Sequence, residues 1–240
     1  MSQKTIQFFF IPLLVAIISS IIYFRRHSSA GQSNKSPETT VPSNTAKPLL
    51  LSDTADKPQA FGYKCCWLAI RTNDSASVLR ALNLKNQQPA NWASGIREAY
   101  DLKGVFVTPP IDGWILVVGA LPDSGDGSRP DLCTPFLQML SKQLGEVQYF
   151  GTHRGVDYHG WAKIKAGKIV RAYAYWADLE TNVWNTGELT EEEKTLGLIF
   201  DNNKTPNEED VMKIAEKWSL NPQNLEKMSL KEGVGVFGEL

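Results

Sequence analysis

The pattern of hydrophobic and polar positions divides the chain into three parts, and the first part is strongly apolar. From Phe8 to Phe24 the sequence FFFIPLLVAIISSIIYF contains no charged residue. Counted from Ile6, an α-helix over this run spans roughly 28 Å, close to the hydrocarbon thickness of a bilayer. Arg25 and Arg26 follow directly and end the run. The pattern predicts a transmembrane helix over residues 6–24.

A cleaved signal peptide is the alternative interpretation of the same run. Lys4 precedes it, and Ser28-Ser29-Ala30 resembles a small-residue cleavage site. However, Arg25 and Arg26 stand between the run and that site, and the run is longer than the usual apolar core of a signal peptide. We therefore expect an uncleaved, single-pass membrane anchor.

Charge and cysteine content indicate where the rest of the chain lies. Arg25, Arg26 and Lys35 follow the span, whereas only Lys4 precedes it, so the positive-inside rule places the C-terminal domain in the cytoplasm. The chain has three cysteines, two of them adjacent, which is typical of free thiols in a reducing compartment. The formal net charge of −1 argues against sequence-independent binding of nucleic acid.

The second part, residues 25–60, has the composition of a flexible linker. It is rich in Ser, Thr, Pro, Asn and Lys and has almost no large apolar side chain before Leu49, so it cannot bury enough surface to offset its ordering entropy. The third part, residues 61–240, contains most of the aromatic residues and can build a core. We expect one transmembrane helix, one disordered linker and one soluble domain.

Helices in this domain are marked by their capping residues. Thr134 precedes Pro135 and a run that ends at Gly145, as expected for a helix with Pro in its first turn and Gly after its end. Thr190 and Thr205 each begin a sequence of the capping-box type. Two further helices are predicted over residues 75–84 and 91–100.

Segments rich in β-branched and aromatic residues alternate with these helices and predict strands. They are residues 65–72, 105–108, 114–119, 147–150, 156–165 and 168–176. Ala166-Gly167 is expected to join the last two as a two-residue hairpin turn. The order of elements predicts an α+β fold, with a mixed or antiparallel sheet and helices packed around it.

The predicted hairpin contains the main candidate site. With a turn at Ala166-Gly167, His159 faces Ala174 and Asp157 faces Trp176, and the four side chains share one face of the sheet. Asp157 then lies beside His159, where it can orient the ring, so that His159 could act as a general base. The candidate residues of this site are His159, Asp157, His153 and Arg154. The alternative is a structural hairpin whose His and Asp are bonded to each other or to backbone.

Aromatic residues on the same hairpin form a candidate binding surface. Trp161, Tyr173, Tyr175 and Trp176 could stack on a sugar or a peptide, although aromatic residues are also favoured in strands and cores. The register places Trp161 and Trp176 on the face of His159, and Tyr173 and Tyr175 on the opposite face.

Other chemistries lack their sequence signatures. There is no nucleophile elbow, no P-loop and no dinucleotide-binding glycine motif, so we expect no cofactor. The loop from Asp123 to Asp131 begins like a calcium loop but lacks the complete ligand series and the terminal Glu. His153 and His159 do not have a zinc-binding spacing on a helix, and no metal is expected.

Two stretches, VFVTPPIDGWILVVG (105–119) and LGEVQYFGTHRGVDYHGWAKIKAGKIVRAYAYW (144–176), resemble segments of an uncharacterised bacterial protein family. The resemblance covers roughly residues 100–220 and implies a bacterial domain without an assigned activity. The expected function is a membrane-anchored binding domain, of an immunity type, that meets a protein partner and is not an enzyme. Its expected partners are the bilayer, through residues 6–24, and that protein. A membrane-tethered hydrolase or transferase using His159 and Asp157 is the alternative, and a sugar-binding module is a third possibility.

Overall fold

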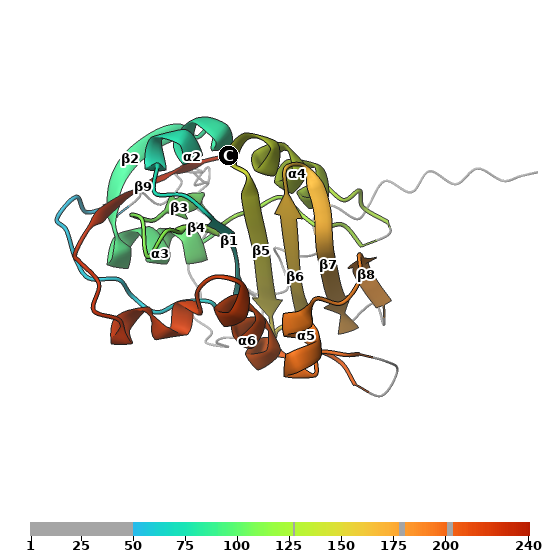
Figure 1. Cartoon of the computed structure of the whole chain (residues 1–240). Coiled ribbons are helices and arrows are strands. Elements are labelled where there is room, and N and C mark those ends of the chain that lie inside the picture. The colour runs from blue at the N-terminus through green and yellow to red at the C-terminus, as the bar shows by residue number, and fades with distance from the viewer. Residues whose placement is uncertain (1–49, 127, 178–180, 201–203) are drawn as a thin grey trace, which may run out of the picture. The chain divides into compact units, whose positions relative to one another are not determined.

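The fold is built on one large antiparallel sheet. The computed structural model describes residues 50–126, 128–177, 181–200 and 204–240, which belong to one structural unit. Within them, nine strands form a sheet with the order β2-β9-β3-β4-β1-β5-β6-β7-β8 (Figure 1). The strands are β1 (Cys65–Ile70), β2 (Lys85–Asn91), β3 (Val105–Val107), β4 (Ile115–Gly119), β5 (Glu146–His153), β6 (Tyr158–Lys165), β7 (Lys168–Trp176), β8 (Thr181–Thr186) and β9 (Val234–Glu239).

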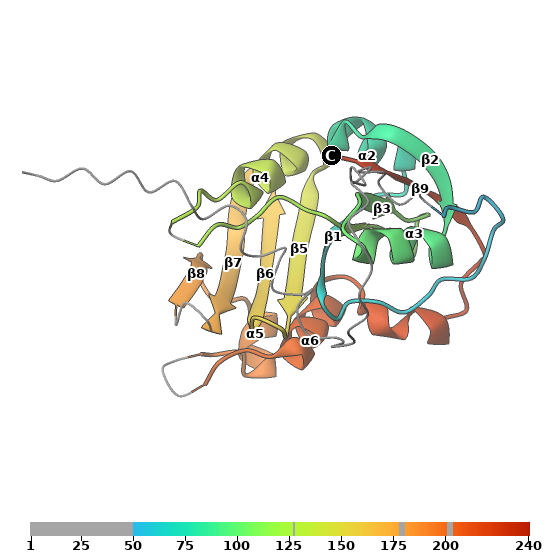
Figure 2. The same ribbon diagram turned by 180° about the vertical axis from the view of Figure 1, so that it is seen from behind.

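Short helices connect these strands. They are α2 (Ser75–Leu82), α3 (Trp92–Tyr100), α4 (Cys133–Leu144), α5 (Glu191–Leu196), α6 (Glu208–Trp218) and the 3-10 helix η3 (Pro222–Lys227). Between β1 and β5 the chain runs β1-α2-β2-α3-β3-β4-α4-β5, and four of its strands lie in the order β3-β4-β1-β5. With β2 set aside, this order is that of a split β-α-β motif. The meander β6-β7-β8 extends this motif beyond β5, and Figure 2 shows β5, β6 and β7 as neighbouring strands from behind.

Both faces of the sheet are covered by apolar clusters, because successive side chains of a strand point to opposite sides. One cluster joins Trp67, Phe150 and Trp161 of the sheet to apolar residues of α3 and α6. The other joins sheet residues such as Leu68 and Val117 to α2 and α4. Strands buried on both faces explain the nearly continuous apolar sequences of β1 and β4.

The expected fold class, an α+β fold with a mixed or antiparallel sheet and helices packed around it, is corrected. The described residues form a nine-stranded sheet with few helices, and every pairing of its named strands is antiparallel. The sequence pattern missed β2, β8 and β9.

The assignment to single-pass membrane proteins is also corrected. No helix among the described residues is long and apolar enough to cross a membrane. The predicted span, residues 6–24, lies outside the described residues, as does most of the predicted linker, residues 25–60.

The hairpin between β6 and β7 has the predicted turn but a different register. Lys165 pairs with Lys168 and Ile164 with Ile169, as expected for a turn at Ala166-Gly167. Val170 is then an extra residue in β7, a β-bulge, so that Lys163 pairs with Arg171 and all later pairs are shifted by one. This shift moves every side chain of β7 beyond the bulge to the face opposite the predicted one.

The helix caps agree with the sequence in one case and differ in another. Thr190 and Glu193 form the predicted capping box of α5. At α6 the capping box is formed by Asn207 and Asp210 rather than by Thr205. Both helices begin with three acidic residues, which interact favourably with the positive end of the helix dipole.

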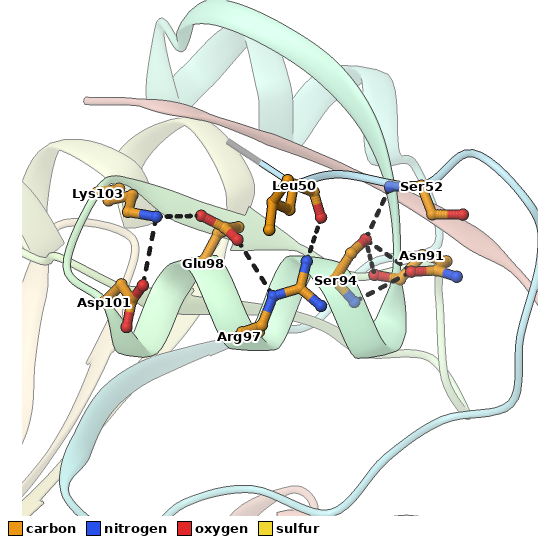
Figure 3. Close-up of polar contacts among 8 residues, drawn as sticks. All are labelled: Leu50, Ser52, Asn91, Ser94, Arg97, Glu98, Asp101 and Lys103. Carbon is orange, nitrogen blue, oxygen red and sulfur yellow. Dashed lines mark hydrogen bonds and ion pairs between the residues drawn. The ribbon is translucent and has the colours of Figure 1, made fainter. Parts of the chain in front are cut away.

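The segment 50–56 lies along α3 and is part of the folded unit (Figure 3). We call it the strap. The Ser52 amide donates a hydrogen bond to Ser94 Oγ at 3.1 Å, and Arg97 donates to the Leu50 carbonyl. Farther along, the carboxylate of Asp56 accepts hydrogen bonds from the Trp92 and Ala93 amides at 2.7 and 3.0 Å. The strap therefore supplies acceptors to the first turn of α3, whose amides have no partner within the helix.

Candidate functional site

A cleft, which we call the charged cleft, lies between the β5–β6 turn and the start of α6. It has a volume of about 550 Å³. The residues that line it are Arg154, Asp157, His159, Asn207, Glu208, Glu209 and Lys213. The cleft therefore brings together three of the four predicted site residues: His159, Asp157 and Arg154. The sequence pattern did not indicate that residues of α6 would form the other side of the cleft.

His159 is a buried member of this site. Its relative exposure is 1%, and it pairs with Thr152 across β5 and β6. Nδ1 lies 2.9 Å from Thr152 Oγ1, and Nε2 lies 2.9 Å from Asp157 Oδ1. Both ring nitrogens thus have hydrogen-bond partners, as expected for a buried polar group.

Asp157 occupies the turn that precedes β6 rather than a strand position. Its backbone has φ 48°, a left-handed conformation that Asp tolerates better than most residues. Its side chain is 54% exposed, so that one carboxylate contacts both the buried ring of His159 and the solvent. The predicted proximity of Asp157 to His159 is confirmed, although the predicted strand pairing of Asp157 with Trp176 is wrong, because Trp176 pairs with Tyr158.

The remaining charges of the cleft are loosely paired. Arg154 Nη1 lies 3.6 Å from Glu208 Oε2, and Lys213 Nζ lies 3.7 Å from Asp210 Oδ1. More than half of the Arg154 and Lys213 side chains is exposed, so these pairs contribute little to stability. Glu209 accepts a hydrogen bond from Tyr63 at 2.7 Å, and this contact raises the pKa of the Tyr63 hydroxyl.

His153 stands at the end of β5 and does not line the cleft. Partial burial lowers the pKa of its imidazole, and nearby Lys64 lowers it further. Neutral His153 is therefore the favoured form at neutral pH. The Glu208 carboxylate acts in the opposite direction on this pKa, and no side-chain hydrogen bond joins His153 to another described residue.

The four aromatic residues predicted to bind a ligand lie on both faces of the sheet. Trp161 and Tyr173 belong to the cluster under α6, where burial raises the pKa of Tyr173 to about 12. Tyr175 packs against the same cluster, and Trp176 against the opposite one. The shift at Val170 places Tyr173 and Tyr175 on the face of His159, contrary to the predicted register. Trp161 and Tyr173 are buried in the core, whereas Tyr175 and Trp176 are only partly buried.

A buried ion pair under α5 was not predicted. Arg171 Nε donates to Glu193 at 2.9 Å, and the side chains are 4% and 0% exposed. The same carboxylate accepts hydrogen bonds from the Trp161 indole at 2.9 Å and from the Thr190 amide at 2.8 Å. In the sequence, Glu193 was recognisable as part of the capping box that begins at Thr190. Its ion pair with Arg171 was not, because the predicted register placed Arg171 on the opposite face of the sheet.

In the loop from Asp123 to Asp131, which begins like a calcium loop, the side chain of Arg129 pairs with the carboxylates. Arg129 contacts Asp123 at 2.6 Å and Asp126 at 2.7 Å. Hydrogen bonds from Ser128 and Arg129 hold the pKa of the Asp126 carboxyl well below its usual range. Among the described residues no group of three or more potential ligands is placed to hold a metal ion.

The three cysteines are free thiols. Burial raises the pKa of Cys65 to about 12 and also raises that of Cys66. Cys66 Sγ lies 3.2 Å from the Tyr149 hydroxyl, which lies 3.2 Å from the Tyr158 hydroxyl. A thiol with a raised pKa is a poor nucleophile, so this cluster fills the core.

No protein-family model, curated protein or solved structure matches this chain. This result is consistent with the resemblance to an uncharacterised family, and it carries no information on a bacterial origin.

Proposed function

We propose that this domain is a non-catalytic binding module that recognises a protein partner through the cleft between the β5–β6 turn and α6. The observation that carries the proposal is the environment of His159. Its ring is 1% exposed, and both nitrogens are hydrogen-bonded, to Thr152 and to Asp157. A general base must contact the proton that it removes, directly or through one water.

The cleft itself has properties that suit recognition. It is open to solvent on its charged side, where Arg154 and Lys213 project and pair only loosely with their neighbours. Acidic groups, among them Glu208 and Glu209, stand beside these cations. Such mixed charges favour orientation and selectivity toward a partner of complementary charge more than they add affinity.

The hydrolase or transferase alternative would require His159 to become accessible, and the arrangement of Thr152 and Asp157 around the ring disfavours this. An immunity-type role is one form of the proposed function and stays a prediction.

The test is site-specific photo-crosslinking in the full chain. A photo-reactive residue at position 154 should capture a distinct protein partner, whereas one at exposed Arg80, on α2 across the sheet, should not. The double variant Arg154→Glu with Lys213→Glu should lose binding to the captured protein, once that protein is purified, without a change in melting temperature. Equal capture from both positions, or unchanged binding of the double variant, would contradict the proposal.

A further inference from the structure

The sheet of the described residues has two edge strands, β2 and β8, and they differ in how well they are protected. An edge strand offers unpaired main-chain groups to other extended segments, and proteins blunt such edges with Lys, Pro, bulges or covering segments. β2 begins with Lys85, contains Pro89 and has an irregular register between Lys85 and Gln88. At its end, the Asn91 amide donates to the Ser52 carbonyl of the strap at 2.7 Å. The β2 edge is therefore poorly suited to further pairing.

β8 lacks most of these protective features. Figure 1 and Figure 2 both show it as the outermost strand, beyond β7. Its sequence, TNVWNT, contains no charged residue and no proline. A bulge at Val183 interrupts its pairing with β7, but Trp184 to Thr186 pair regularly. Among the described residues, no strand other than β7 pairs with β8, and no loop forms a main-chain hydrogen bond with it.

The main chain of β8 therefore has hydrogen-bonding groups to offer. Successive residues of an antiparallel strand direct their N–H and C=O groups alternately to the two sides. Some of these groups in β8 accordingly point away from β7, where an added strand would meet them.

Side-chain contacts hold β8 in place without a second neighbouring strand. Trp184 is 7% exposed, its indole donates to the Asp131 carboxylate at 3.0 Å, and its ring packs edge-on against Tyr149. On the opposite face, Arg171 Nη1 donates to the Asn185 side-chain oxygen at 2.9 Å. The edge is therefore preorganised, which reduces the entropic cost of binding.

Charges around β8 indicate the chemistry of the segment that it would bind. Glu188, two residues beyond the strand, is exposed, and Asp131, which contacts Trp184, is partly exposed. Two cations contact this region and are already paired with carboxylates: Arg171 with Glu193, and Arg129 with Asp123 and Asp126. Opposite charges on neighbouring strands stabilise their pairing, so a segment with basic residues is complementary to this edge.

A second copy of the chain fits the same edge less well. Two β8 strands paired antiparallel about a twofold axis would bring the residues after one strand close to those before the other. In the sequence, Glu188 follows β8, and Asp178 and Glu180 precede it. Like charges would therefore meet at both ends of such a pair and destabilise it.

We propose that β8 binds an extended, basic segment of a partner protein, which adds a further strand to the sheet. In this mode of recognition, main-chain hydrogen bonds supply affinity and alternate side chains supply specificity. β8 contributes no residue to the charged cleft, so the proposal does not depend on the function assigned to that cleft.

The experiment uses the ¹⁵N-labelled full chain and the synthetic peptide Lys-Thr-Val-Lys-Val-Thr-Lys with both ends blocked. The amide resonances of Trp184 to Thr186 should shift during titration, whereas those of β2 should not. The same peptide with N-methyl groups on its three central residues cannot donate the main-chain hydrogen bonds and should have no effect. Unchanged β8 resonances, or an equal response to the methylated peptide, would overturn the proposal.

A charge variant tests the basic character of the ligand. Glu188→Lys should weaken peptide binding by about two- to fivefold, because it reverses an exposed charge beside the added strand. Glu216→Lys makes the same change in net charge at an exposed residue of α6 and should leave binding unchanged. Equal weakening in the two variants would overturn the proposed basic ligand.

Photo-crosslinking separates a partner protein from the chain itself as the occupant of this edge. A photo-reactive residue at exposed position 182 of the full chain should attach to the peptide, whereas one at exposed position 88 on β2 should not. A crosslink from position 182 to residues 1–49, or to β8 of a second copy, in the absence of peptide would show that the chain covers its own edge. Either crosslink would overturn a partner protein as the ligand.

Discussion

Asp157 Oδ1 lies 2.9 Å from His159 Nε2, across the boundary between solvent and core. The carboxylate is half-exposed and the imidazole is buried, so their contact closes the end of the hairpin next to the charged cleft. We expect this relationship to give His159 a structural role, with a measurable consequence for stability.

We expect His159→Ala to lower the free energy of unfolding by about 1–3 kcal/mol, because it leaves Thr152 without its partner in a buried position. Urea unfolding measures the change. Binding to the partner captured at position 154 should fall only as far as the folded fraction falls. A stable His159→Ala protein that has lost all function would instead support the enzymatic alternative.

The buried ion pair between Arg171 and Glu193 predicts a larger decrease in the free energy of unfolding. Glu193→Gln removes the charge that pairs with Arg171 and should cost about 3–5 kcal/mol, because the guanidinium stays buried without a counter-ion. Glu191→Gln, on the same helix, breaks an exposed pair with Lys194 and should cost no more than about 1 kcal/mol. Similar losses in the two variants, measured by urea unfolding, would contradict this ranking.

The side chain of Glu98 predicts a pH dependence of stability. Its hydrogen bond to Lys103 lowers the pKa of the carboxyl below the usual value, which in unfolded chains is about 4.3. At acidic pH the unfolded state therefore binds more protons than the folded state. The contribution is complete above the unfolded pKa and is lost as the pH falls through the folded pKa.

Glu98→Gln should accordingly flatten the acid side of a stability profile measured by urea unfolding between about pH 3 and 6. Glu216→Gln, at an exposed residue of α6, is the matched control. If the stability of Glu98→Gln depends on pH as steeply as that of the unchanged protein, the contact between Glu98 and Lys103 does not contribute to the pH dependence.

The bulge at Val170 predicts which deletions β7 tolerates. Deleting Val170 retains every other pair between β6 and β7, because Lys163 already faces Arg171 and Ile164 faces Ile169. Deleting Ala172 shifts Tyr173 to Trp176 by one residue and turns their side chains to the wrong faces. We expect the first variant to keep a cooperative thermal transition and the second to lose it.

The sequence predicted local features well where short-range chemistry determines them. The Ala166-Gly167 turn and the Thr190 capping box are confirmed because both depend on a few adjacent residues. The contact between His159 and Asp157 was also predictable, since the two lie two residues apart.

Features that depend on tertiary pairing were not predictable. β2 has the polar sequence KNQQPAN and becomes a strand because it pairs with β9, far along the chain. The extra residue in β7 has no sequence signature, and it alone decided on which face Arg171 would lie. The helix α6, which forms one side of the charged cleft, was predicted as a helix. Its position beside the β5–β6 turn could not be inferred from the sequence.

The position of β9 affects how the protein is made. β9 pairs with both β2 and β3, although ribosomes synthesise it more than a hundred residues after either of them. Until it emerges, β3 has one open edge, and β2 has no partner in the described sheet. A nascent chain stalled before Val234 therefore presents unpaired strands to chaperones and to other nascent chains, and this half of the sheet can close only after β9 has been synthesised.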